Sequence, residues 1–144
     1  PETVDEAMLA FGMPMGPIEL ADTVGLDIAM AAGKQLAGSA EPPRCLLARA
    51  EKNQLGKKSG HGFYAWRDGK AQKAAAGSVP AGLAERLARP LIERTERLVA
   101  DGIVADADLA DAGVIFGTGF APFTGGPLNR QKTEKQQVVA RAQH

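Results

Sequence analysis

Residues 12–17 combine side chains that could contact an apolar ligand, and they read Gly-Met-Pro-Met-Gly-Pro. Met13 and Met15 are flexible and polarisable, so they can adapt to apolar chains of different length. Glycine lets the backbone approach a ligand closely, and the two prolines stiffen the bend. An equally open alternative is a bend that only joins two helices, with both methionines in the core. The candidate binding residues here are Met13, Pro14, Met15 and Gly16.

Residues 56–62 form a second candidate segment, rich in glycine and lysine and therefore expected to be a loop. Lys57 and Lys58 could contact a phosphate group of a ligand, although solvated lysines are the more common outcome for such residues. The aromatic residues that follow are expected to anchor this loop on the helices: Phe63, Tyr64 and Trp66.

The sequence offers no catalytic, cofactor-binding or metal-binding set. Its histidines, His61 and His144, belong to no HExxH pattern, and Ser59 precedes His61 without an evident orienting carboxylate. A lone Cys45 excludes both an intrachain disulfide and a zinc site built from cysteines. Residues 117–119 read Gly-Thr-Gly, but no third glycine follows at the spacing of a dinucleotide-binding turn.

Composition indicates a globular protein with 44% hydrophobic and 24% charged residues. Seventeen basic residues balance seventeen acidic ones, which argues against nucleic acid or an anionic membrane as the main partner. No stretch approaches the roughly 20 apolar residues of a membrane span. The single cysteine suits an intracellular location, either cytoplasm or an organelle matrix. Because the chain starts at Pro1, we interpret it as a fragment.

Hydrophobic periodicity predicts an all-α fold. Thr3 to Glu6 fit a capping box that starts a helix ending at Gly12. Pro17 is expected to start a second helix, and Asp27 a third that runs to about residue 37. Further helices are expected over residues 44–52, 81–101 and 106–116, and a cut-off helix in the polar tail. Pro90 should kink or split the longest one.

Two segments of the sequence read alike, which indicates a duplicated helical unit. Phe11-Gly12 is followed 105 residues later by Phe116-Gly117, and Gly16-Pro17 is followed 110 residues later by Gly126-Pro127. This period is too long for a solenoid repeat. We predict a first copy over residues 1–66 without its lead-in helix, a linker over 67–79, and a second copy over 80–144 with a truncated tail.

Three motifs in order resemble the C-terminal domain of 3-hydroxyacyl-CoA dehydrogenases. Residues 12–27 resemble its signature, and residues 56–64 resemble the loop that closes the domain. Residues 117–127 resemble the second copy found in fatty-acid oxidation α subunits. His61 stands where the family often has lysine. The resemblance implies an all-α, duplicated domain like the C-terminal domain of 6-phosphogluconate dehydrogenase.

The resemblance also implies a function, namely NAD-dependent oxidation of 3-hydroxyacyl-CoA in fatty-acid β-oxidation. NAD and the catalytic His–Glu pair would belong to a Rossmann domain outside this chain, so the chain alone should be inactive. Expected partners are acyl-CoA, that Rossmann domain, and a second copy or a thiolase β subunit. Two alternatives stay open: a purely structural or dimerisation module, and the C-terminal domain of a related hydroxy-acid dehydrogenase.

Overall fold

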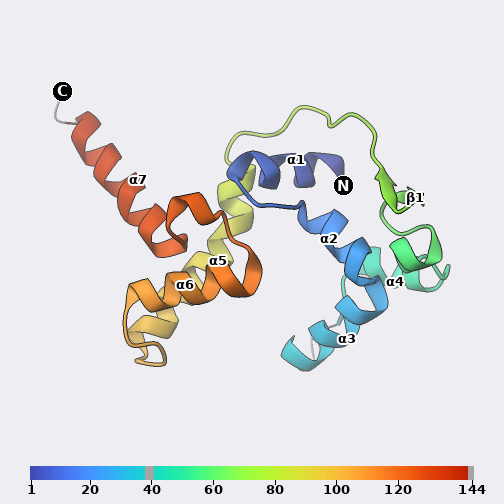
Figure 1. Cartoon of the computed structure of the whole chain (residues 1–144), viewed down its shortest axis with the longest axis horizontal. Helices are drawn as coiled ribbons and strands as arrows, with labels where there is room; N and C mark the ends of the chain where they lie inside the picture. The colour runs from blue at the N-terminus through green and yellow to red at the C-terminus, as the bar shows by residue number, and fades with distance from the viewer. Residues whose placement is uncertain (38–40, 143–144) are drawn as a thin grey trace. The chain divides into compact units, whose positions relative to one another are not determined.

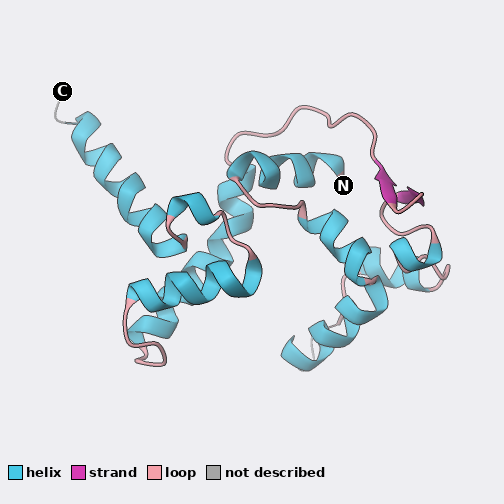
Figure 2. Cartoon of the chain, in the orientation of Figure 1, coloured by secondary structure: helices cyan, strands magenta, loops and turns pink. Residues whose placement is uncertain are grey.

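The computed structural model describes residues 1–37 and 41–142 and is mostly helical, as predicted (Figures 1 and 2). The helices, in chain order, are α1 (Glu2–Phe11), α2 (Pro17–Val24), α3 (Leu26–Ala37), α4 (Arg44–Ala50), α5 (Leu83–Ala100), α6 (Ala107–Thr118) and α7 (Pro127–Ala142). Two 3-10 turns, η1 (Lys57–Ser59) and η2 (Pro122–Thr124), interrupt the loops. No described helix has the length and apolar character needed to cross a membrane.

A short antiparallel hairpin follows the glycine-rich loop. Strand β1 (Ala65–Arg67) pairs with β2 (Lys70–Gln72), so that Trp66 lies opposite Ala71. The turn between the strands is Asp68-Gly69, and both residues have positive φ, as a tight two-residue hairpin turn requires. The second strand thus lies inside the segment 67–79 for which the sequence predicted a linker without regular structure.

The chain divides into two compact units. Unit 1 comprises residues 1–6 and 15–79, and unit 2 comprises residues 7–14 and 80–144. Helix α1 contributes to both, because its first residues belong to unit 1 and its remaining residues to unit 2. The sequence-based boundaries, in contrast, assigned all of residues 1–66 to one copy.

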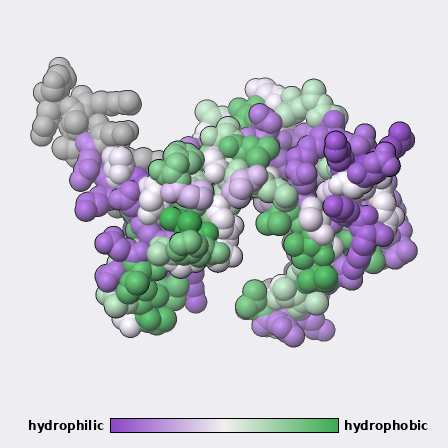
Figure 3. All heavy atoms as spheres, in the orientation of Figure 1, coloured by the Kyte–Doolittle hydropathy of each residue, from purple (hydrophilic) through white to green (hydrophobic). Residues whose placement is uncertain are grey.

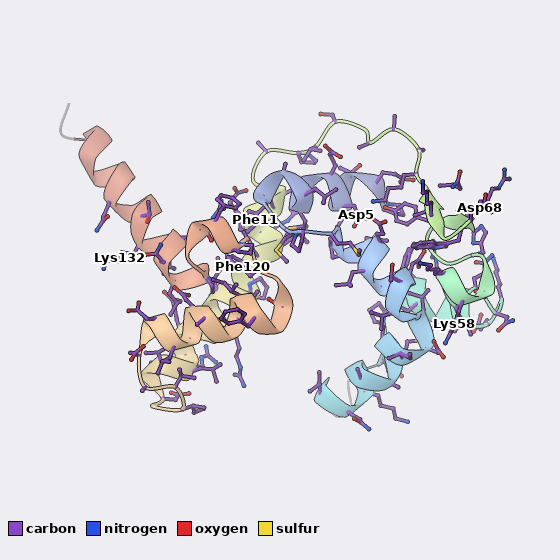
Figure 4. The ribbon with its side chains drawn as sticks, viewed as in Figure 1. Asp5, Phe11, Lys58, Asp68, Phe120 and Lys132 are labelled. Atoms are coloured by element: carbon purple, nitrogen blue, oxygen red, sulfur yellow. The ribbon has the colours of Figure 1, made fainter. Side chains whose placement is uncertain are left out.

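Unit 2 has the apolar core, which the second half of α1 shares with α5 and the loop after α6. Met8 and Phe11 pack there with Ala88, Phe120 and Ala121, and all five are buried. The Phe11 and Phe120 rings meet edge to face with their centroids 5.6 Å apart (Figure 4). Such pairs add about 0.5–1.5 kcal/mol beyond the burial of their surface.

Two local expectations differ from the structure. Helix α1 begins at Glu2, and the amides of Val4 and Asp5 bond to the carbonyl of Pro1, so Thr3 is inside the helix and does not cap it. Helix α5 is not split at Pro90, which is exposed, while the alternative of a kink stays a prediction. A missing N–H can be tolerated on a solvent-facing side, because the carbonyl it leaves free can bond to water.

Candidate functional site

Helix α2 begins after a glycine that cannot cap it with a side chain. Gly16 is the N-cap residue, Pro17 is the first helical residue, and no side chain of the N-cap bonds to the helix. The free amides of the first turn therefore need an acceptor from elsewhere in the chain. Asp5 of α1 supplies it, because its Oδ1 accepts from Ile18 N at 2.8 Å and its Oδ2 from Glu19 N at 3.1 Å.

Gly16 is the residue that makes this approach possible. A Cβ at this position would overlap the carboxyl group of Asp5, so any side chain would displace the acceptor. Asp5 is only 1% exposed, and the carboxylate lies against the start of α2, where the partial positive charge of the helix favours an anion. The glycine of the bend is therefore needed for close packing inside the protein.

Tyr64 joins the glycine-rich loop to the same carboxylate. Its hydroxyl donates to Asp5 Oδ2 at 2.8 Å, and the side chain is 2% exposed. Burial, and then the hydrogen bond to Asp5, raise the pKa of Tyr64 well above its usual range. The phenol is consequently a fixed, neutral hydrogen-bond donor at physiological pH.

Lys73, just after β2, is a positively charged partner of Glu19 and Asp5. Its Nζ lies 2.6 Å from Glu19 Oε2 and 3.6 Å from Asp5 Oδ2. Partial burial lowers the pKa of Lys73, but the hydrogen bond and the charge of Glu19, together with Asp5, outweigh this effect, and the net pKa is raised. The ion pair ties the segment after the hairpin to α2.

Asp22 of α2 holds the loop from the other side and is fully buried. Its Oδ1 accepts from Phe63 N at 2.9 Å, and its Oδ2 accepts from Tyr64 N at 2.9 Å and from Trp66 Nε1 at 3.1 Å. One carboxylate thus satisfies three donors of the loop. Gly62 is required for this contact, because a Cβ there would overlap Asp22.

The aromatic residues are loop anchors, as the sequence indicated. Tyr64 and Trp66 bond to the two buried aspartates, and the guanidinium of Arg49 lies 3.9 Å from the centre of the Phe63 ring. Neither acceptor, Asp5 or Asp22, was predicted from the sequence. The available signal was an aspartate at an apolar face of a helix, as at Asp5 between Val4 and Met8.

The residues predicted to contact an apolar ligand do not all face solvent: some are packed inside the protein and one is exposed. Met13 packs against the core of unit 2, and a Cβ on Gly119 would lie 3.2 Å from the Pro14 ring. Gly16 is buried against Asp5, as described above. Met15 is 36% exposed and remains available to a ligand.

The two predicted phosphate contacts differ in their surroundings. Lys58 forms an ion pair with Asp27 at 2.5 Å, and this contact lowers the pKa of Asp27. Asp27 was predicted to cap α3, but the helix begins at Leu26 and the carboxylate pairs with Lys58 instead. Lys57 lies beside the Trp66 ring, with Nζ 5.5 Å from its centroid.

The hydroxyl of Ser59 and the ring of His61 are engaged in local contacts. Ser59 Oγ accepts from Leu55 N at 2.8 Å and bonds to the carbonyl of His61 at 2.8 Å. His61 Nδ1 lies 3.2 Å from the carbonyl of Gly62. These contacts shape the loop and do not align the two side chains as nucleophile and base. Within the described residues, no cluster of histidine, cysteine and carboxylate is placed to hold a metal ion.

Each unit also contains a hollow. The one in unit 1 measures about 110 Å³ and is mainly apolar, with Met30, Pro42 and Leu46 in its wall. The one in unit 2 measures about 380 Å³ and is lined partly by Phe11 and Arg130. Neither hollow is lined by the predicted binding residues.

Unit 2 repeats the arrangement of Asp5 with a second aspartate. Asp111 of α6 is 3% exposed, and its two oxygens accept from Leu128 N at 2.8 Å and Asn129 N at 2.9 Å at the start of α7. Gly126 takes the place of Gly16, since a Cβ on it would overlap Asp111.

The sequence-based pairing of Phe11-Gly12 with Phe116-Gly117 does not match the pairing of Asp5 with Asp111. Phe11 is buried and Gly12 ends α1, whereas Phe116 is 89% exposed and Gly117 lies inside α6. Helix α6 ends seven residues after Asp111, whereas α1 ends six residues after Asp5. The two Phe-Gly pairs are therefore identical in sequence but not equivalent in structure.

The first part of the chain is similar to a known protein family. Residues 1–66 match the family model of the 3-hydroxyacyl-CoA dehydrogenase, C-terminal domain. The fatty acid oxidation complex subunit alpha of Vibrio cholerae is 34% identical over 149 residues, covering 92% of this chain and 21% of the relative. The subunit of the same name from Ectopseudomonas oleovorans is 38% identical over 150 residues, covering 87% of this chain and 21% of the relative. The chain thus spans about a fifth of the length of these curated relatives.

A solved structure supports the fold. The dehydrogenase part of multifunctional enzyme 1 from C. elegans superposes with a TM-score of 0.53 at 24% identity, covering 74% of this chain and 28% of that one. At this identity the likeness concerns the arrangement of the helices.

Proposed function

We propose that this chain is the helical C-terminal part of an NAD-dependent 3-hydroxyacyl-CoA dehydrogenase of fatty-acid β-oxidation. The family match over residues 1–66 is the observation that carries the proposal. The matched residues include the bend at 12–17 and the glycine-rich loop. They also include Asp5, Asp22 and Tyr64, which join the loop to the helices. The relatives named as α subunits of the fatty acid oxidation complex support the same assignment.

We propose that NAD binds outside the described residues of this chain. A bound dinucleotide needs a glycine-rich turn between a strand and the start of a helix. The described strands form one antiparallel hairpin, and Gly117 and Gly119 lie at the end of α6 instead of at a helix start. We therefore assign NAD and the hydride-transfer chemistry to another part of the protein, and we expect this chain alone to show no turnover.

The contribution of this chain would be to shape the acyl-CoA side of the cleft. Met15 supports this role, because it is a flexible apolar side chain left 36% exposed beside a bend fixed by Asp5. The packing of Met13 and Pro14 favours the alternative, a structural or dimerisation module without substrate contact.

We further propose that the two units derive from a duplicated domain. A shared arrangement supports this proposal: a buried aspartate on one helix accepts from the first amides of a later helix, and a glycine before that helix leaves room for the carboxylate. It occurs as Asp5 with Gly16 and as Asp111 with Gly126. As partners of the complete protein we propose acyl-CoA, an NAD-binding domain, and a second copy or a thiolase subunit.

Replacing Met15 with tryptophan in the complete enzyme tests the contact with substrate. We expect kcat/KM for long acyl substrates to fall roughly tenfold, about 1.4 kcal/mol, with little change for acetoacetyl-CoA. Leu47→Trp is the matched control, because Leu47 is similarly exposed at 38% but lies on α4.

Two results would count against these proposals. An unchanged chain-length profile for Met15→Trp would leave the structural alternative. Failure of the complete unmodified protein to reduce acetoacetyl-CoA with NADH would overturn the dehydrogenase assignment itself.

A further inference from the structure

The charges of unit 1 are distributed unevenly along the sequence. Residues 44–73 hold eight lysines and arginines against two acidic residues, although the whole chain is neutral. Residues 1–43 hold one lysine against seven acidic residues. Hydrophilic side chains cover the part of unit 1 that carries the loop and the hairpin (Figure 3). Residues 44–73 therefore carry a net charge of +6 within a neutral protein.

Three of these cations already have partners inside unit 1. Lys58 pairs with Asp27, and Lys73 pairs with Glu19. Arg49 stacks on a phenylalanine ring and bonds to two backbone carbonyls. These side chains support the fold of the loop.

Three other cations gather at the end of the hairpin. Arg67 and Lys70 lie directly opposite each other in the strand register. A Cβ on Gly69, in the turn between them, would lie 3.8 Å from Lys57 Nζ. Lys57, Arg67 and Lys70 are all exposed, and among the described residues none of them forms an ion pair within 4.0 Å. We name these three residues the hairpin-tip cations.

This arrangement is unfavourable for the protein by itself. Like charges directly opposite on neighbouring strands destabilise a hairpin. The third cation beside the turn adds to the repulsion. Asp68 in the turn supplies one negative charge at the outer end of the hairpin (Figure 4), which leaves a net charge of +2 over these four residues. A doubly negative group would complete the charge balance, and its oxygens are the acceptors that lysine and arginine donate to.

We infer that the hairpin-tip cations form a binding site for a phosphate-bearing group, specifically the 3′-phosphate and pyrophosphate end of a coenzyme A ester. The inference rests on the proposed function for the choice of coenzyme A and on the geometry of unit 1 for the choice of phosphate. It reassigns the expected phosphate contact: Lys57 takes part, while Lys58 is occupied by Asp27.

Titration of the 144-residue chain with adenosine 3′,5′-bisphosphate, followed by backbone amide NMR, tests the site directly. We expect the largest shifts at Lys57, Gly69 and Lys70. Neutralising all three cations to glutamine should weaken binding at least tenfold, and the affinity should fall as salt is added. Inorganic phosphate, titrated in parallel, should bind more weakly through the same amides, because it lacks the second phosphate and the nucleoside.

Two matched variants control for general charge effects. Lys34→Gln removes an exposed charge on α3, and Lys52→Gln removes an exposed charge just after α4; both should leave the affinity within about twofold. Equal weakening by Lys34→Gln, or unchanged binding after loss of the three tip cations, would overturn the inference. If inorganic phosphate binds as tightly as the nucleotide, the coenzyme A assignment is wrong. Acyl-CoA turnover by the complete enzyme, measured separately, tests the proposed function, so the two failures can be told apart.

Discussion

Replacing Asp22 with asparagine should detach the glycine-rich loop from α2. The carboxylate accepts three hydrogen bonds, from Phe63 N, Tyr64 N and Trp66 Nε1, and it is fully buried. Asparagine has one acceptor oxygen and one NH2 group. If its oxygen keeps the two donors on the Oδ2 side, its NH2 group faces the amide of Phe63, and two donors then meet without an acceptor.

The magnitude follows from these contacts. Leaving one buried donor unsatisfied costs about 1–3 kcal/mol, and replacing a charged acceptor by a neutral one weakens each of the two remaining hydrogen bonds by about half. The total of about 2–5 kcal/mol is a large share of the roughly 5–15 kcal/mol that stabilises a typical domain. We therefore expect Asp22→Asn either to detach the loop locally or to lower strongly the urea concentration at which the chain unfolds.

The chain contains one tryptophan, Trp66, which lies in the loop and reports on its docking. In urea titrations of Asp22→Asn, the fluorescence transition should move to lower urea and precede the loss of helical circular dichroism. Asp101→Asn is the control, because Asp101 is exposed and lies just after α5, outside the loop and α2. If the two variants unfold at the same urea concentration as the unmodified chain, the three hydrogen bonds are not important for stability and the reasoning is refuted.

Two further predictions concern the contacts around Asp5. Tyr64 is the only tyrosine, and burial with the Asp5 hydrogen bond raises its pKa from the usual 10.0, so the unfolded chain loses the phenol proton at lower pH than the folded chain. Stability should thus be intact below pH 10 and decline above it, and phenolate absorbance should appear only as helical circular dichroism is lost; ionisation of the folded chain near pH 10 would contradict this. Gly16→Ala should cost about 1–3 kcal/mol through overlap with Asp5, and Gly126→Ala at least as much, because its φ of 110° adds strain. Gly33→Ala, which meets no atom within 4 Å on α3, should instead stabilise by about 0.5–1 kcal/mol, and thermal melts that rank these variants differently would rule out the packing argument.

Local signals in the sequence determined most of the secondary structure. Proline and glycine act on the backbone within one or two residues, so Gly12 and Pro17 could be recognised as the end of one helix and the start of the next. The spacing of apolar residues likewise predicted the helix now observed at Leu83–Ala100. The aromatic anchors of the loop were also recognisable, because large side chains in a glycine-rich segment have to be buried somewhere.

The tertiary structure alone decided which groups satisfy each other. Asp5 resembled part of a local capping box, yet its partners are 13, 14 and 59 residues away in the chain. A charged residue on a helix is usually exposed, and only the full set of neighbouring donors shows that Asp22 is not. The same holds for the similar arrangement at Asp111, because aligning Phe11-Gly12 with Phe116-Gly117 leaves Asp111 one residue out of register with Asp5. Burial and hydrogen bonding depend on distances in space between segments remote in sequence, and a sequence pattern contains no such distances.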